Sequence, residues 1–361
     1  MRFDETLQEY KKLIDDELVK FFGRIIRERT TNDFLLELYK DLEEFVLNGG
    51  KRLRPIALIQ AYKAVKGSVD DEIVRASIAV ELYHNSTLVH DDIMDEDESR
   101  RGKPTVFQHM KEYFLKDRAE ESYRGPLFDR KSCRFAASQA LLGGNILVEL
   151  SKKPLLDSGF EEKRVINALR AMCDCAEAVN IGQVDDLVLE TDKDADEDKY
   201  YDMIEKKTGR LFISSIQIGA ILAGASEQQL KALSEYAKLA ATTFQLHDDI
   251  IEILPDNKKG HERGSDIRQG KMTLLTIKAL ERGSDAQKKD LLKALGNPSA
   301  SQEEINQAIK VIFDTGAIEY SKQLALKKIE EGKKWLSKAE FNEDGIAFFR
   351  DFADFMINRE M

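Results

Sequence analysis

The sequence has 361 residues and a formal net charge of −11, with 42% hydrophobic and 34% charged residues. This acidic balance argues against a nucleic-acid-binding protein, because a phosphate backbone is usually met by a basic surface. No run of 18 apolar residues occurs, so we expect no transmembrane segment, and an odd count of three cysteines favours unpaired thiols in a reducing cytoplasm.

Helical periodicity recurs along almost the whole chain, whereas the alternation typical of β-strands is nearly absent. The pattern predicts helices over residues 4–27, 33–47, 70–94, 135–150, 163–189, 200–223 and 227–254, followed by further amphipathic helices. Asn48-Gly49-Gly50 should end the second helix, and Pro55 suits the first turn of the next. Because no Ser-, Gly- or Pro-rich linker divides the chain, we predict one all-α domain over residues 1–361, although the length alone suggests two.

The segment 110–134 stands out because it is densely charged and is broken at Gly125-Pro126. We interpret it as an insertion. A solvated helical excursion is the simpler interpretation, and a lid or a partner surface is the alternative.

Two long apolar helices end in similar acidic patches. Residues 88–95 have the sequence LVHDDIMD and residues 245–252 have the sequence QLHDDIIE. Helix residues four apart share a face, with Cβ atoms about 5–6 Å apart, so Asp91 lies beside Asp95 and Asp248 beside Glu252. A cation would remove their repulsion, and ligands that are all oxygens favour Mg²⁺ or Mn²⁺. We expect both patches to face one cavity that holds a polyphosphate; two solvated helix ends are the alternative.

Basic residues indicate a second anion site without a metal. Three of them follow two glycines beside a predicted helix N-terminus, where free N–H groups attract anions. Two arginines follow the first acidic patch, and the guanidinium group suits bidentate contacts with phosphate. Each residue alone is more typical of a surface cation, and only the set indicates a site. The candidates are Lys51, Arg52, Arg54, Arg100, Arg101, Lys207 and Lys271.

From about residue 41 to residue 280 the chain resembles the trans-isoprenyl diphosphate synthases. The shared blocks are GGKRLRP at 49–55, His84, DDIMD at 91–95, RRGKPT at 100–105, GQVDDL at 182–187, KTGRLF at 207–212, FQLHDDIIE at 244–252 and GSDIRQGKMTL at 264–274. The resemblance implies an all-α bundle around a central cavity, usually in a homodimer. It also implies that isopentenyl diphosphate is joined to an allylic diphosphate (dimethylallyl, geranyl or farnesyl) to give a linear all-trans product.

The resemblance further implies roles for individual residues. Three Mg²⁺ ions would hold the allylic diphosphate on Asp91, Asp95 and Asp248, assisted by Asp92, Asp249 and Glu252, and Mn²⁺ could replace Mg²⁺. Arg100, Lys207 and either Lys258 or Lys259 would contact the same diphosphate. Isopentenyl diphosphate would contact Lys51, Arg54, His84 and Arg101. Lys271 is a further candidate for substrate binding and is not assigned to either diphosphate. Thr208 and Gln245 would lie near the reacting carbons.

Three features depart from the family pattern. Glu252 stands where the family usually has Asp, the segment 110–134 is longer than usual, and the family's histidine after Pro-Thr has only His109 nearby. We expect Glu252 to shift the metal geometry without loss of activity.

Product length should depend on the helix before Asp91, whose turns each rise about 5.4 Å, close to one isoprene unit. Ser86 is small and should not block the growing chain, whereas Tyr83, one turn deeper, is the next candidate floor. This favours geranylgeranyl diphosphate, with products of 25 or more carbons as the alternative. A class I terpene cyclase and a non-catalytic subunit of a heteromeric synthase are weaker rivals, because the sequence keeps GGKRLRP and both acidic patches.

Overall fold

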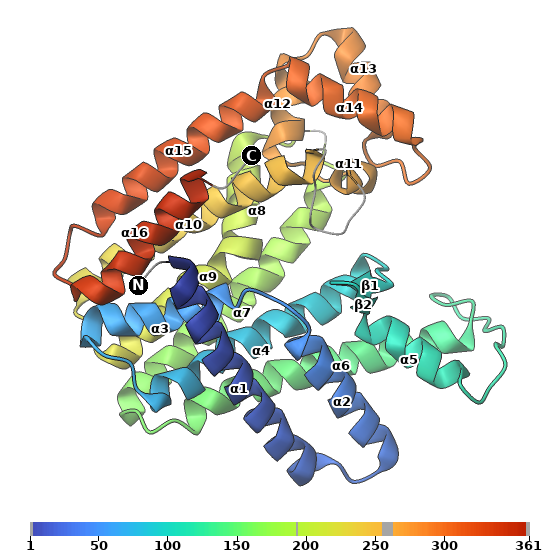
Figure 1. Ribbon diagram of the computed structural model, residues 1–361. Coiled ribbons are helices and arrows are strands. Elements are labelled where there is room, and N and C mark those ends of the chain that lie inside the picture. Colours follow the sequence, from blue (N-terminus) through green and yellow to red (C-terminus); the bar gives the residue numbers. More distant parts are fainter. Residues whose placement is uncertain (1–2, 193, 255–262, 359–361) are drawn as a thin grey trace. The chain divides into compact units, whose positions relative to one another are not determined.

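The computed structural model describes residues 3–192, 194–254 and 263–358, and their regular secondary structure is helical apart from one short hairpin (Figure 1). The prediction of an all-α fold is therefore confirmed. The contacts divide the chain into two compact units, Met1–Ile59 with Val69–Leu169 and Gln60–Ser68 with Arg170–Met361. The single domain expected over residues 1–361 stays a prediction.

The first unit is built around α4 (Asp71–Met94), which packs against α1 (Phe3–Arg29), α2 (Asp33–Leu47), α5 (Val106–Leu115) and α6 (Lys131–Leu156). The Asp70 side chain accepts a hydrogen bond from the Ile73 N–H and so caps α4. A short hairpin of β1 (Ser99–Arg100) and β2 (Lys103–Pro104) follows the helix. The first residues of α3 (Leu53–Lys66) also belong to this unit.

The second unit is built around α10 (Glu227–Ile253), which packs against α9 (Arg210–Ala223) and α15 (Ala317–Trp335). The Ser226 hydroxyl and the Gln229 side chain form a capping box at its N-terminus. The other elements of this unit are the last part of α7 (Glu162–Leu189), α8 (Glu197–Ile204), the π-helix η1 (Glu205–Gly209), α11 (Ser265–Gln269), α12 (Leu274–Arg282), α13 (Asp285–Ala294), α14 (Gln302–Asp314) and α16 (Glu343–Asn358).

The predicted helices agree closely with the observed ones where apolar periodicity is strong. The bounds of α2 are as expected, and α4, α7 and α10 differ from the prediction by one residue at an end. The predicted helix over 200–223 is divided by η1, and α5 was not predicted. No helix among the described residues is long and apolar enough to cross a membrane.

The segment 110–134 begins inside α5 and ends inside α6, with irregular chain from 116 to 130. Glu120 lies at the start of α6, where its carboxylate accepts hydrogen bonds from the Ser132 hydroxyl and the Ser132 N–H. This carboxylate takes the place of a helix cap, because the residue at the N-cap position, Arg130, makes no capping bond. Its role as an insertion stays a prediction.

Candidate active site

The first acidic patch lies at the C-terminal end of α4. Asp91 is half-buried in the last turn, and Asp95 is the exposed residue that ends the helix, with its N–H donating to the Asp91 carbonyl at 2.8 Å. Half-buried His84, Leu88 and Asp91 recur at helical spacing, so they share one face of α4. This face carries the charges that the sequence assigns to phosphate and metal.

Asp92 lies on a different side of α4 and is only 1% exposed. Its Oδ1 accepts a hydrogen bond from Arg100 Nε at 2.5 Å, whereas its Oδ2 is buried without a partner among the described residues. Burial raises the pKa of Asp92 to about 6, although Arg100 opposes the shift. Asp92 therefore positions Arg100, which was predicted to contact the allylic diphosphate, at the start of the hairpin.

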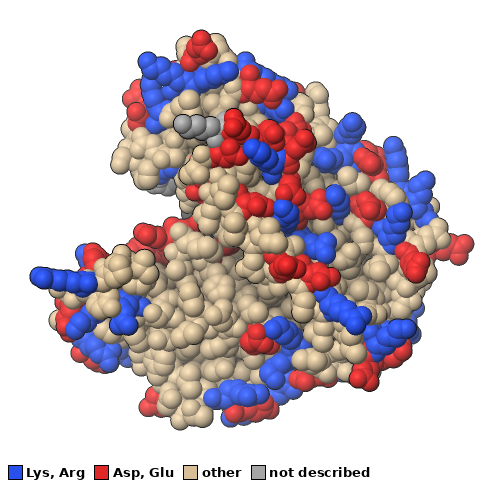
Figure 2. Space-filling view, turned by 180° about the vertical axis from the view of Figure 1, so that it is seen from behind, with Lys and Arg blue, Asp and Glu red and all other residues tan. Residues whose placement is uncertain are grey.

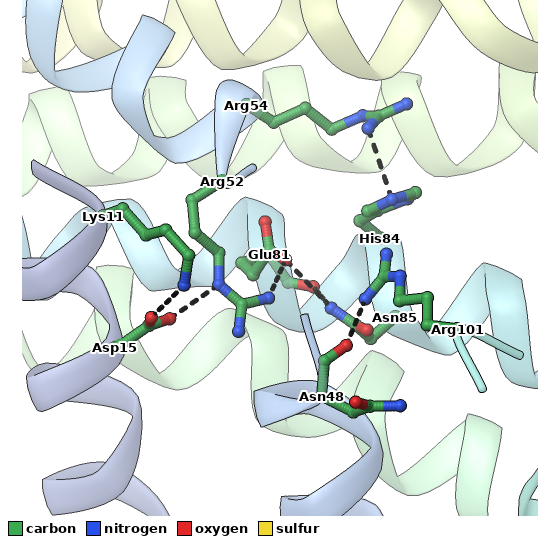
Figure 3. A network of polar contacts seen from close by, with 9 residues as sticks. All are labelled: Lys11, Asp15, Asn48, Arg52, Arg54, Glu81, His84, Asn85 and Arg101. Carbon is green, nitrogen blue, oxygen red and sulfur yellow. Dashed lines mark hydrogen bonds and ion pairs between the residues drawn. The ribbon is translucent and has the colours of Figure 1, made fainter. Parts of the chain in front are cut away.

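Near the glycine hinge between α2 and α3 lie three of the residues predicted to bind isopentenyl diphosphate, Arg54, His84 and Arg101 (Figure 3). Gly49 and Gly50 have φ values of 72° and 82°, which glycine adopts without strain. A Cβ on Gly50 would lie 3.3 Å from Arg101 Nη1, so these glycines also leave space for that guanidinium. Arg101 Nη1 donates to the Asn48 carbonyl at 2.9 Å.

Arg54, in the first turn of α3, contacts His84 on α4, with 3.3 Å between Nη1 and Nε2 (Figure 3). Burial, and next the charge of Arg54, lowers the pKa of His84 well below its usual value. The imidazole is therefore neutral. Since a guanidinium only donates hydrogen bonds, His84 Nε2 accepts and Nδ1 carries the proton. Lys51 directly follows the two glycines of the hinge and is exposed.

Arg52, which also belongs to this basic segment, is buried away from solvent. Its side chain is 0% exposed and forms ion pairs with Asp15 and Glu81. Among the seven basic candidates, Arg52 is therefore a buried structural residue and does not face a phosphate site.

In the second unit, Lys207, Thr208, Gln245, Asp249 and Lys271 line one cavity. These residues come from three separate blocks of the sequence, so the fold joins residues that were predicted to act together. The cavity is also lined by Asp186, Tyr200, Met203, Ile204, Asp266, Met272 and Thr273.

Asp186 links the two lysines of this cavity. Its Oδ2 accepts from Lys207 Nζ at 2.6 Å and from Lys271 Nζ at 2.9 Å. Lys271 also donates to Glu190 at 2.7 Å, and the carboxylates raise its pKa against the effect of burial. Asp186 was not assigned a role from the sequence, although it lies in the GQVDDL block. The sequence does place Asp186 one helical turn before Glu190, and this acidic pair could have indicated a site for the lysines.

The Lys207–Thr208 pair lies on η1, and π-helical turns occur frequently at functional sites. Gly182 on α7 packs against this turn, where a Cβ would lie 2.2 Å from the Lys207 backbone nitrogen. Only a residue without a side chain permits this contact. The first residue of GQVDDL therefore positions the backbone that carries Lys207.

The second acidic patch differs from the first because two of its three carboxylates are buried. Asp249 Oδ1 accepts from Gln245 at 2.7 Å and Oδ2 accepts from Tyr200 at 2.6 Å. Glu252 accepts from the Ser265 hydroxyl at 3.1 Å. Burial raises the pKa of Asp249 to about 7 and that of Glu252 to about 6. Asp248 is the half-buried member of the patch.

No group of three or more His, Cys, Asp or Glu side chains that could hold a metal occurs among the described residues. Mg²⁺ usually binds through one or two carboxylates and completes its shell with water and substrate phosphate. Asp91 with Asp95, and Asp248, are hard oxygen donors of that kind. The donor set therefore fits Mg²⁺ bound together with a polyphosphate, and the metal ligands stay a prediction.

The two residues predicted to control product length are both buried. Ser86 is fully buried and donates its hydroxyl to the Tyr83 carbonyl at 2.6 Å, and Tyr83 is 3% exposed. Thr87, in contrast, is half-buried on the face of α4 that carries Asp91. Lys258 and Lys259 lie outside the described residues.

Comparisons with known proteins agree on one family. Residues 36–312 match the family model described as polyprenyl synthetase. A geranylgeranyl diphosphate synthase of Methanosarcina mazei is 36% identical over 325 residues, which cover 90% of each chain. A short chain isoprenyl diphosphate synthase of Methanocaldococcus jannaschii is 37% identical over 90% of this chain and 89% of that protein. The solved structure of a geranylgeranyl pyrophosphate synthase from Corynebacterium glutamicum, complexed with isoprenyl diphosphate and magnesium, has a TM-score of 0.89 and 26% identity, covering 98% of this chain and 99% of that one.

Proposed function

This chain belongs to the polyprenyl synthetase family and is a trans-prenyltransferase, and we propose that its product is geranylgeranyl diphosphate. The Methanosarcina mazei relative carries that name, and small Ser86 is compatible with a chain longer than farnesyl. A product of 25 or more carbons is the alternative.

The observation that carries the assignment of a condensing enzyme is the cluster of Arg54, Arg101 and neutral His84 near the glycine hinge, which also contains exposed Lys51. This group suits a diphosphate that binds without metal, as expected for isopentenyl diphosphate. A terpene cyclase needs no second diphosphate site, and a non-catalytic subunit needs no complete acidic patches. The hinge and both patches therefore favour an active condensing enzyme over these two rivals.

In the proposed mechanism, Asp91, Asp95 and Asp248 would hold the allylic diphosphate through Mg²⁺. The metal would withdraw charge from the leaving diphosphate. Arg100 and Lys207 would stabilise the same developing charge, and the residues of the hinge would orient isopentenyl diphosphate for attack. No protein base is assigned, because the departed diphosphate is itself a suitable proton acceptor.

One assay tests the proposal. The purified full chain is incubated with Mg²⁺, isopentenyl diphosphate and dimethylallyl, geranyl or farnesyl diphosphate, and products are separated by length. We expect a linear C20 diphosphate, no turnover after chelation, and recovery with Mg²⁺ or Mn²⁺. A C25 or longer product would overturn the assigned length. A cyclic hydrocarbon, or turnover only with a second polypeptide, would overturn the proposed function.

We also propose a homodimer located in the cytoplasm. The apolar side chains of Ile181, Val184 and Val188 are exposed at helical spacing on α7, and Leu141 and Leu142 are exposed on α6. Figure 2 shows surface on which charged side chains are sparse. Exposed apolar patches of this kind are typical of subunit interfaces.

A further inference from the structure

We propose that Asp15 on α1 is a positioning residue for isopentenyl diphosphate, acting through the buried guanidinium of Arg52. The inference rests on the proposed function, because that function assigns Lys51, Arg54 and His84 to this substrate. Asp15 lies before residue 36, where the match to the family model begins. The N-terminal helix would therefore contribute to a site that the family motifs alone do not include.

The guanidinium of Arg52 is held by two carboxylates from different helices (Figure 3). Its Nε donates to Asp15 Oδ1 on α1 at 2.7 Å, and its Nη1 donates to Glu81 Oε1 on α4 at 2.6 Å. The exposed fraction of the side chain is 0% for Arg52, 3% for Glu81 and 29% for Asp15. Lys11, one turn before Asp15 on α1, also pairs with that carboxylate.

Such a network is a weak source of stability, because the loss of hydration offsets much of the attraction between buried charges. It does, however, define the position of the groups it joins. Arg52 has a φ of 52°, and a residue other than glycine keeps this conformation only where its surroundings enforce it. The two ion pairs supply that enforcement at the end of the glycine hinge.

The position of Arg52 determines those of the residues on either side of it. Its carbonyl accepts from the Ile56 N–H at 3.0 Å and so begins α3, which carries Arg54 in its first turn. Glu81 and His84 are three residues apart on α4, so they lie on neighbouring turns. The buried Arg52–Glu81 pair and the Arg54–His84 contact therefore lie next to each other and both join the start of α3 to α4.

Gly50 connects this network to Arg101. A Cβ on Gly50 would lie 3.2 Å from Arg52 Nη1 and 3.3 Å from Arg101 Nη1, so the glycine separates the two guanidinium groups. A shift of Arg52 would therefore move the backbone that spaces Lys51, Arg54 and Arg101. Without Asp15, Arg52 would keep one carboxylate, and the hinge would lose its connection to α1.

Steady-state kinetics of the full-length enzyme test the proposal, with isopentenyl and allylic diphosphate varied separately. We expect Asp15→Asn to raise the KM for isopentenyl diphosphate about ten-fold, because a charge-assisted hydrogen bond is weakened, and to leave the allylic KM unchanged. Asp16→Asn is the matched control, since Asp16 is the exposed neighbour on the same helix and loses the same charge. Arg52→Lys keeps the charge but loses the planar guanidinium that contacts both carboxylates, so it should also raise the KM for isopentenyl diphosphate.

Lys51→Ala and Arg54→Ala serve as references for the substrate site. If both raise the KM for isopentenyl diphosphate while Asp15→Asn only lowers the melting temperature or kcat, Asp15 has a structural role and the inference is overturned. If neither reference variant changes that KM, the site assignment of the proposed function is wrong, and the inference is wrong with it. A selective KM increase in the references, Asp15→Asn and Arg52→Lys, with Asp16→Asn unchanged, would support the proposal.

Discussion

Ser86 is the residue whose side chain should decide product length. A phenyl ring at this position would block a prenyl product that grows along α4. We therefore expect Ser86→Phe to shorten the main product by one or more isoprene units. The measurement is the length distribution of the dephosphorylated products. Because Ser86 is fully buried, a larger side chain should cost about 1–3 kcal/mol of stability, so the melting temperature is measured as well.

Thr87 provides the contrast for this experiment, because it is half-buried on the face of α4 that carries Asp91. Thr87→Phe adds a ring of similar size one residue away. If Thr87→Phe shortens the product and a folded Ser86→Phe does not, the prenyl product grows along the face of α4 that carries Thr87, and the assignment of Ser86 is wrong.

Gly182 is a residue at which a single methyl group should disturb the active site. A Cβ there would lie 2.2 Å from the backbone nitrogen of Lys207 and 2.6 Å from its Cα. We expect Gly182→Ala to displace η1, to lower kcat/KM at least ten-fold and to destabilise the fold by about 1–3 kcal/mol. Steady-state kinetics and thermal unfolding measure the two effects.

Gly332 on α15 is the matched control, because a Cβ there would meet its nearest neighbour, Leu239 Cβ, at an ordinary 3.5 Å. Gly332→Ala should keep full activity and gain up to about 1 kcal/mol from helix propensity. Equal losses in both variants would contradict the role given to Gly182.

At the scale of elements, a contact between buried Asp41 and half-buried His109 joins α2 to α5. His109 Nδ1 lies 2.5 Å from Asp41 Oδ1, and this hydrogen bond raises the pKa of His109, whereas burial raises that of Asp41. A histidine whose pKa is raised by folding stabilises the fold fully at pH values below its pKa in the unfolded chain, which is about 6.5. This contribution is lost as the pH rises through the pKa of the folded protein.

We therefore expect His109→Gln to be destabilised relative to the wild type by about 1 kcal/mol near pH 6, and by less near pH 9. Denaturant unfolding at several pH values measures the difference. A difference that grows with pH would show that the charge of His109 does not stabilise the α2–α5 contact.

The elements with strong apolar periodicity were predictable, and those set by tertiary contacts were not. The bounds of α2, α4, α7 and α10 follow from helical patterns and capping residues such as Asp70 and Ser226. The π-helix η1 was not predicted, because it packs against Gly182 of another helix and this contact leaves no pattern in the local sequence. The ion pairs of Asp186 were missed for the same reason: its lysine partners are 21 and 85 residues away in sequence.

At the scale of the whole molecule, the exposed apolar stripe on α7 should determine the oligomeric state. Val184 and Val188 are 59% and 57% exposed and lie one turn apart, with Ile181 one turn earlier at 44%. Burying such a stripe against a second copy removes apolar area from water, which stabilises the dimer by about 25 cal/mol per Å² of apolar area buried. A charge at its centre would have to be buried without a partner, which is costly. We therefore expect a dimeric wild type and a monomeric Val184→Glu variant, measured by light scattering after size-exclusion chromatography.

Val19→Glu is the matched control, because Val19 on α1 is similarly exposed at 50% and lies outside this stripe. It should leave the dimer intact, which separates the effect of position from that of added charge. A monomeric wild type would overturn the proposed dimer. A Val184→Glu protein that stays dimeric would move the interface away from the α7 stripe, because an unpaired glutamate at the centre of a dry contact would cost several times the thermal energy.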